Sequence, residues 1–118
     1  MNLPRLAAIL GFLGVALGAF GAHALRGRVG ADLIEVWKTG VLYHLLHVLA
    51  LLAVAALGSR LARPRLVAGL FVAGIAIFSG SLYLLVLTEQ RRWGAVTPVG
   101  GLAFLAGWLA MAVGARRS

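Results

Sequence analysis

The chain has no cysteine, and only three of its 118 residues are acidic. Without cysteine there can be no disulfide, thiolate metal site or cysteine nucleophile. Charged residues make up 12% of the chain, about half of the share that is usual in soluble domains. Hydrophobic residues make up 62%, which is more apolar surface than a soluble domain of this length can bury. The solvent for most of this surface is therefore predicted to be a lipid bilayer.

Four apolar stretches occupy most of the sequence, at about 6–25, 36–57, 66–87 and 98–115. Each has roughly 18 to 22 residues, the length that an α-helix needs to cross ~30 Å of hydrocarbon. Backbone amides in lipid need internal partners, and no strand-like alternation is present, so all four are predicted to be helices. We expect an all-α, integral membrane four-helix transmembrane bundle, with residues 1–118 forming a single four-span membrane domain.

The first apolar stretch has an alternative interpretation. Arg5, the apolar run and Ala22-His23-Ala24 resemble a secretory signal peptide with its cleavage site. The run is long for the apolar region of a signal peptide, so we expect a membrane span.

The basic residues lie in short tracts beside the apolar stretches and give a net charge of +8. Five of them are expected to contact anionic lipid headgroups: Arg60, Arg63, Arg65, Arg116 and Arg117. No nucleic-acid partner is expected, because aromatic residues do not alternate with basic ones on a helix face. Six basic residues lie on the side of the termini and five on the other side. A margin of one residue is small, and in this direction we expect both termini to lie in the cytoplasm.

Small residues recur every three or four positions in three of the predicted helices. The glycines expected to mediate helix packing are Gly11, Gly14, Gly18 and Gly21, then Gly69 and Gly80, then Gly100, Gly107 and Gly114. Such a stripe lies on one helix face and lets two backbones approach closely in lipid. The spacing fits a left-handed bundle, and it equally fits a homo-oligomer. Glycine is also common in membrane helices in general.

The polar residues of the apolar stretches gather at one end of the predicted bundle. Four-span threading places on one side the end of the first helix, the start of the second, the end of the third and the start of the fourth. The candidate polar cluster there consists of His23, Tyr43, His44, His47, Ser79, Ser81, Tyr83 and Thr97. Trp108 is the main polar exception in the other half.

Three interpretations of this cluster remain open. The residues could cross-link helices by hydrogen bonds, since polar groups in hydrocarbon need partners. The three histidines could instead bind zinc, copper, nickel or haem, although the spans hold no carboxylate to complete a site. A histidine relay for ions or protons is the third interpretation. We expect no resident cofactor and no metal site.

No enzymatic motif is present. The sequence has no Ser-His-Asp set, no His-Glu-x-x-His and no phosphate-binding loop, because Gly100-Gly101 lacks the following lysine. We therefore predict that the protein is not an enzyme. Trp37, Trp93 and Trp108 are expected to be anchors at the membrane interface.

Four motifs carry a family resemblance. They are Gly-Ala-Phe-Gly-Ala-His at 18–23, Trp37-Lys38-Thr39-Gly40 with Tyr43-His44 and His47, Phe-Ser-Gly-Ser-Leu-Tyr at 78–83, and Thr-Pro-Val-Gly-Gly at 97–101. In this order they resemble the YgdD-like family, domain of unknown function 423, to which eukaryotic transmembrane protein 256 is similar. The resemblance implies a small multi-pass protein of the bacterial inner membrane. The family has no established biochemical role, so it provides no catalytic residue.

Together these observations predict a non-enzymatic accessory, interaction or lipid-contacting bundle, and the glycine stripes fit a homo-oligomer of it. The alternative is binding or transport of a small molecule, metal or ion through the polar cluster.

Overall fold

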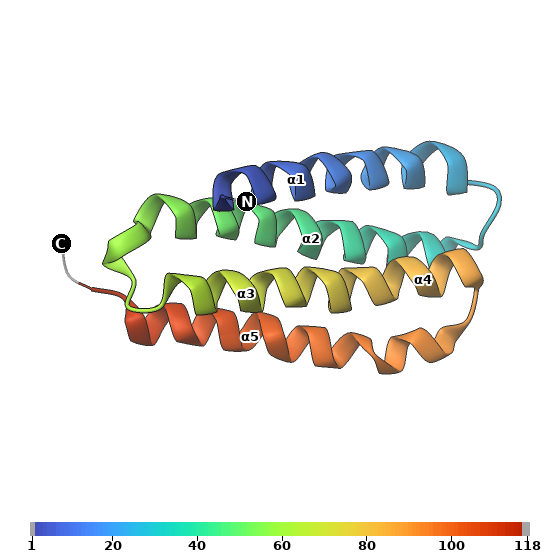
Figure 1. Cartoon of the computed structure of the whole chain (residues 1–118). Helices are drawn as coiled ribbons and strands as arrows, with labels where there is room; N and C mark the ends of the chain where they lie inside the picture. Colours follow the sequence, from blue (N-terminus) through green and yellow to red (C-terminus); the bar gives the residue numbers. More distant parts are fainter. Residues whose placement is uncertain (1, 117–118) are drawn as a thin grey trace.

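The computed structural model describes residues 2–116, and its first two long helices form one half of the molecule (Figure 1). The first consists of α1 (Leu3–Phe20) and the π-helical turn η1 (Gly21–Leu25). Asn2 caps it, since its side chain accepts a hydrogen bond from the Arg5 backbone N–H. The second consists of α2 (Ala31–Leu57) and the 3₁₀ turn η2 (Gly58–Arg60).

The other half contains two more long helices. The third is built from α3 (Pro64–Gly74), the π-helical segment η3 (Ile75–Ser79) and α4 (Gly80–Thr88). The fourth begins with the 3₁₀ turn η4 (Arg91–Ala95) and continues as α5 (Thr97–Gly114). Proline stands in the first turn of both α3 and α5, where its missing N–H costs no hydrogen bond.

The prediction of an all-α membrane fold is confirmed. Four helices, at 3–25, 31–60, 64–88 and 91–114, are long and apolar enough to cross a membrane. The predicted spans lie within them apart from Ala115, and the described residues form no β-strand. The helices extend beyond most predicted spans because polar and charged residues can remain helical where the helix ends reach water. The division into a single domain stays a prediction.

The two ends of the molecule differ in what they contain. The α1–α2 and α4–α5 connections lie at one end, which we call the loop 1 end, and both termini and the α2–α3 connection lie at the other (Figure 1). At the terminal end the chain is tied to the α2–α3 connection. The Ala62 N–H donates to the Gly114 carbonyl at 2.8 Å, and the Arg116 N–H donates to the Arg60 carbonyl at 2.7 Å.

The helices follow one another in the order α1, α2, α3–α4, α5 from top to bottom in the view of Figure 1. α1 packs on α2, and α2 packs on the third helix, which in turn packs on α5. Within the most apolar 18 residues of each helix, buried residues make up 39% in the second helix and 44% in the third. They make up only 17% in the first and in the fourth helix. The outer helices therefore present long apolar faces to lipid, with Phe12 and Val15 on α1 and Leu105 and Val113 on α5 among the exposed residues.

Two apolar clusters fill the interior. One lies toward the terminal end and includes Leu51, Val54 and Phe71. The other lies toward the loop 1 end and is built around Trp37 and Val86.

Candidate functional site

The glycines of the first helix all face the second helix. For a Cβ atom built at each, the nearest neighbour is a side chain of α2. The pairs are Gly11 with Val48, Gly14 with Leu45, Gly18 with Val41 and Gly21 with Trp37. At Gly14 that Cβ would lie 2.5 Å from Leu45 Cδ2, so even one methyl group would force a shift. This stripe therefore sets the close approach of α1 and α2 within one chain.

The glycines of α5 face the third helix in the same way. A Cβ at Gly100 would collide with the backbone nitrogen of Phe78, and one at Gly107 would lie 2.6 Å from Phe71 Cε1. Gly114 faces Ala62 at 3.3 Å. On the third helix the glycine that meets a neighbour is Gly74, which faces the ring of Phe104 and was not among the predicted packing residues.

Gly69 and Gly80 lie differently from the other predicted packing glycines. A Cβ at either position has no atom of the described residues within 4 Å. Ala76, which lies between them and continues the three-or-four-residue spacing of small residues, is exposed. This stripe therefore faces away from the other helices of the described chain, and its packing role stays a prediction.

His44 links three helices through two hydrogen bonds. Its Nε2 lies 2.8 Å from the Leu10 carbonyl oxygen of α1. A carbonyl only accepts, so Nε2 carries the proton and donates. Its Nδ1 lies 2.8 Å from Tyr83 Oη and accepts from that hydroxyl. The neutral ring thus uses both nitrogens inside the protein.

His47 uses the opposite tautomer. Its Nδ1 lies 2.8 Å from the Tyr43 carbonyl oxygen and donates to it. Its Nε2 accepts from the Trp108 indole N–H at 3.0 Å, which joins α2 to α5. The imidazole also stacks on Phe104, with ring centroids 3.6 Å apart. The hydrogen bonds assign the Nδ1–H form to His47 and the Nε2–H form to His44.

The hydroxyl groups make further links between helices. Ser79 Oγ donates to the Gly40 carbonyl of α2 at 2.7 Å. Ser81 Oγ donates to the Phe78 carbonyl at 2.9 Å, which leaves its oxygen to accept from Thr97 Oγ1 at 2.6 Å. These bonds join the third helix to α2 and to α5.

The structure thus distributes the predicted polar cluster over several separate links at different depths. His23 is exposed on η1 and takes no part in them. Tyr43 contributes its carbonyl and a half-exposed ring, which packs on Phe78 with centroids 4.7 Å apart. Trp108, which the sequence set apart from the cluster, is the partner of His47. Among residues 2–116, no three His, Asp or Glu side chains form a group that could hold a metal ion.

The expectation that Trp37 anchors the membrane interface is wrong. Its side chain is buried, with 1% exposed, and its indole N–H donates to the Leu17 carbonyl at 2.8 Å. The cause is Gly21, whose missing side chain leaves room for the indole under α1. Antiparallel threading, which places Gly21 opposite the largest side chain at the start of α2, is the sequence signal for this contact.

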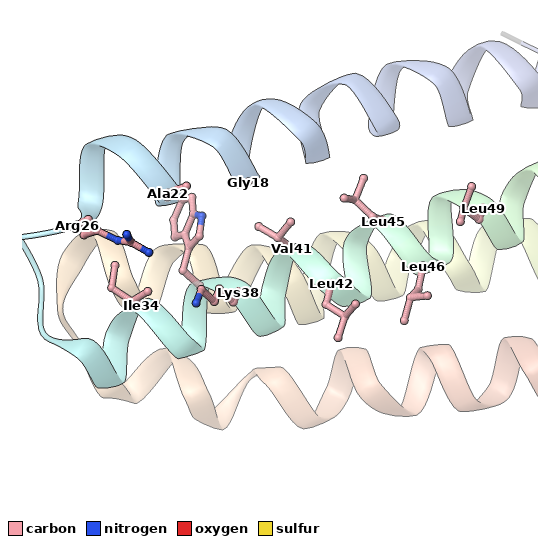
Figure 2. Close-up of a pocket in the computed structure, with 12 residues that line it drawn as sticks. Gly18, Ala22, Arg26, Ile34, Lys38, Val41, Leu42, Leu45, Leu46 and Leu49 are labelled. Atoms are coloured by element: carbon pink, nitrogen blue, oxygen red, sulfur yellow. The ribbon is translucent and has the colours of Figure 1, made fainter.

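A groove of about 400 Å³ lies between α1 and α2 and was missed by the sequence reasoning (Figure 2). Small residues on the α1 side, among them Gly18 and Ala22, face leucine-rich turns of α2 that reach as far as Leu49. Arg26 and Lys38 lie together at the loop 1 end of this groove (Figure 2).

A second groove, of about 550 Å³, lies between α2 and α5. Aromatic side chains line much of it, including Tyr43, Phe78, Phe104 and Trp108. Its polar wall is formed by His47, whose two nitrogens are already hydrogen-bonded.

The charged side chains lie at the two ends of the molecule. Arg91 pairs with Asp32 at 2.5 Å, and Lys38 pairs with Glu35 at 3.5 Å. All four are exposed, so these pairs contribute little to stability. Of the arginines expected to contact lipid headgroups, Arg60, Arg63, Arg65 and Arg116 are exposed at the terminal end, and Arg117 lies outside the described residues.

Comparison with known proteins gives a consistent set of relatives. The family model "Protein of unknown function (DUF423)" matches residues 17–101. The UPF0382 inner membrane protein YgdD of Escherichia coli strain K12 is 50% identical over 113 residues, covering 94% of this chain and 86% of its own. The UPF0382 membrane protein YwdK of Bacillus subtilis is 48% identical over 113 residues, covering 93% and 92%.

A third relative extends the comparison to staphylococci. The UPF0382 membrane protein SSP2132 of Staphylococcus saprophyticus is 41% identical over 110 residues, which is 92% of each chain. No solved structure matches this chain.

Proposed function

This chain belongs to the DUF423 family of proteins of unknown function, and from its own residues we propose that it is a non-enzymatic membrane protein that binds lipid within the bilayer. Its Escherichia coli relative is named an inner membrane protein, which supports placing this chain in the inner membrane. The four apolar helices support a multi-pass arrangement there. The cytoplasmic location of the termini is a prediction from the basic residues.

The observation that carries the proposal is that the polar side chains between the helices are already paired. His44, His47, Ser79 and Ser81 are buried, and each has its hydrogen bonds within the chain. Among the described residues, the one buried side-chain polar atom without a partner is the indole nitrogen of Trp93. A general base or metal ligand needs a free lone pair facing a substrate, and neither histidine offers one. These groups are better suited to holding helices together.

The apolar surface supports lipid as the ligand. The outer faces of α1 and α5 are exposed, and the groove between α1 and α2 opens beside them. No water fills such a groove in hydrocarbon, so lipid chains must occupy it or leave a void.

Native mass spectrometry of the protein released gently from its own membrane tests the proposal. We expect ions of the chain mass, or of whole multiples of it, that retain one or more phospholipid masses. Multiples would also give the stoichiometry of a homo-oligomer. A retained metal or haem, or a chain that never retains lipid, would contradict the proposal.

A binding or conducting role for the polar residues is the second candidate. The observation that favours it is the aromatic groove between α2 and α5, which reaches Tyr43 and His47. This role predicts ion flux into liposomes that is lost in the His44→Leu or His47→Leu variant. Unchanged or absent flux in all three proteins would exclude conduction.

A further inference from the structure

The groove between α1 and α2 combines an apolar channel with a cationic entrance. Its wall on α2 is formed by side chains such as Val41, Leu45 and Leu49. Its α1 side contains Gly18 and Ala22, which are too small to fill the space. Figure 2 shows Val41, Leu45 and Leu49 extending from α2 toward α1.

The length of the groove along α2 corresponds to the hydrocarbon thickness of one membrane leaflet. Lys38 and Leu49 are eleven residues apart on α2, a rise of ~16 Å at 1.5 Å per residue. Half of a ~30 Å hydrocarbon layer is ~15 Å. A chain that starts at the level of Lys38 therefore ends near the middle of the membrane, as a phospholipid acyl chain does.

The two cations are available to an anion. Arg26 makes no hydrogen bond or ion pair through its side chain among residues 2–116, and Figure 2 shows that side chain reaching over the groove toward α2. Lys38 has one partner, Glu35, in an exposed pair 3.5 Å long. Such a pair is weak, so a phosphate can compete for the ammonium group. A guanidinium is suited to bind phosphate oxygens in pairs.

We propose that this groove is a binding site for one anionic phospholipid, with an acyl chain along α2 and the headgroup phosphate at Arg26 and Lys38. This inference rests on the proposed function and names the lipid class. A zwitterionic headgroup carries its own cation, which weakens its attraction to two basic side chains. The site therefore discriminates by headgroup charge.

The test measures lipid binding to the full chain in neutral detergent by native mass spectrometry. Phosphatidylglycerol and phosphatidylcholine with identical acyl chains are titrated separately. We expect the first phosphatidylglycerol to bind about tenfold more tightly than the first phosphatidylcholine, as two basic side chains near a headgroup allow. Inorganic phosphate at the same concentration should not displace the lipid, because it has no acyl chain.

Charge variants locate the site. The double variant Arg26→Gln, Lys38→Gln should lose the tenfold preference. The control Arg28→Gln, Arg92→Gln removes the same charge from exposed residues of the loop 1 end that do not line the groove, and should keep it. If the control loses the preference equally, the selectivity comes from overall charge and the inference is wrong.

A blocked groove provides a second, charge-independent test. Ala22→Trp places a large ring in the groove from an exposed position, whereas Ala19→Trp places the same ring on an exposed part of α1 that does not line it. We expect only Ala22→Trp to weaken phosphatidylglycerol binding, by tenfold or more, with unchanged thermal unfolding of both variants. Equal binding in both variants would overturn the groove as the site.

The lipid titration separates the two proposals. Equal affinity of the unmodified chain for both lipids would contradict the anionic site and leave lipid binding intact. Binding of neither lipid would contradict both. Displacement by inorganic phosphate would show an anion site that does not recognise lipid, which also overturns the inference.

Discussion

The two outer helices, α1 and α5, both pack on their neighbours through glycines, yet the two contacts differ. α1 meets α2 through four glycines that receive mostly aliphatic side chains. α5 meets the third helix through Gly100 and Gly107, which receive the Phe78 backbone and the Phe71 ring. In return, Gly74 of the third helix receives the ring of Phe104. The contact of α5 with the third helix is interlocked from both sides, whereas that of α1 is one-sided.

The difference shows what a glycine stripe determines. The stripe fixes how closely two backbones approach, and the opposing side chains decide whether the space beside them is filled. Aromatic rings interlock at α5, whereas leucine and valine tips leave the groove beside α1. The unfilled contact is therefore the one where a lipid can bind.

The largest effect is expected at the interlocked contact. Gly100→Ala sets a methyl group against the Phe78 backbone, which cannot rotate away as a side chain can. We expect the free energy of unfolding to fall by about 3 kcal/mol, the upper range for overpacking. Steric-trap or denaturant unfolding in micelles measures it, and a loss below that of Gly14→Ala would reverse the ranking of the two contacts.

The next largest effect is expected at the hydrogen bonds that join α2 to α1 and to α4. His44→Leu leaves the Leu10 carbonyl and the Tyr83 hydroxyl without their partner, so we expect a loss of about 1–3 kcal/mol. Tyr83→Phe should cost about 1 kcal/mol. In a double-mutant cycle the two losses should be less than additive, and additive losses would mean that the ring and the hydroxyl do not interact.

A smaller effect is expected at the one-sided contact. Gly18→Ala presses against a methyl group of Val41, whereas Gly14→Ala presses mainly against the movable end of Leu45 and also lies 3.2 Å from Cδ2 of His44. Each should destabilise the protein by about 1 kcal/mol, the lower range for overpacking. Gly107→Ala, against the less mobile Phe71 ring, should cost more than either, and thermal unfolding of the three variants gives the order.

The smallest effect is expected at Gly69, where a Cβ meets only open space among the described residues. Gly69→Ala should change the free energy of unfolding by no more than about 0.5 kcal/mol. A larger loss, or dissociation of an oligomer in native mass spectra, would show that this stripe packs against another copy of the chain.

Much of the fold follows from the sequence because lipid imposes strong constraints. The apolar lengths locate the four helices, and the spacing of Gly11, Gly14, Gly18 and Gly21 indicates a packing face. The order of the helices could not be predicted, since the small residues of the third helix, which include Ala73 and Ala76 between Gly69 and Gly80, recur at similar intervals, yet neither of these glycines meets another helix. Spacing gives a face and does not say which helix covers it.

The sequence predicts which polar residues form hydrogen bonds between helices better than it predicts their partners. Their number and types predict hydrogen bonds between helices, and His44 and Tyr83 do form one. The pairing of His47 with Trp108 depends on the relative heights of α2 and α5, which no local pattern gives. The groove could not be predicted because it depends on where the small residues of one helix lie opposite the other helix. It also depends on the level at which Arg26 and Lys38 lie in the membrane.

The central claim is that the polar side chains hold helices together while lipid is the ligand, and His47→Leu tests it most directly. Native mass spectra of this variant and of the unmodified chain, both released from the same membrane, compare what each protein retains. The account predicts that the variant keeps the same phospholipid mass while its thermal unfolding shifts to lower temperature. Loss of a retained mass with unchanged unfolding would contradict the account and identify His47 as part of a binding site.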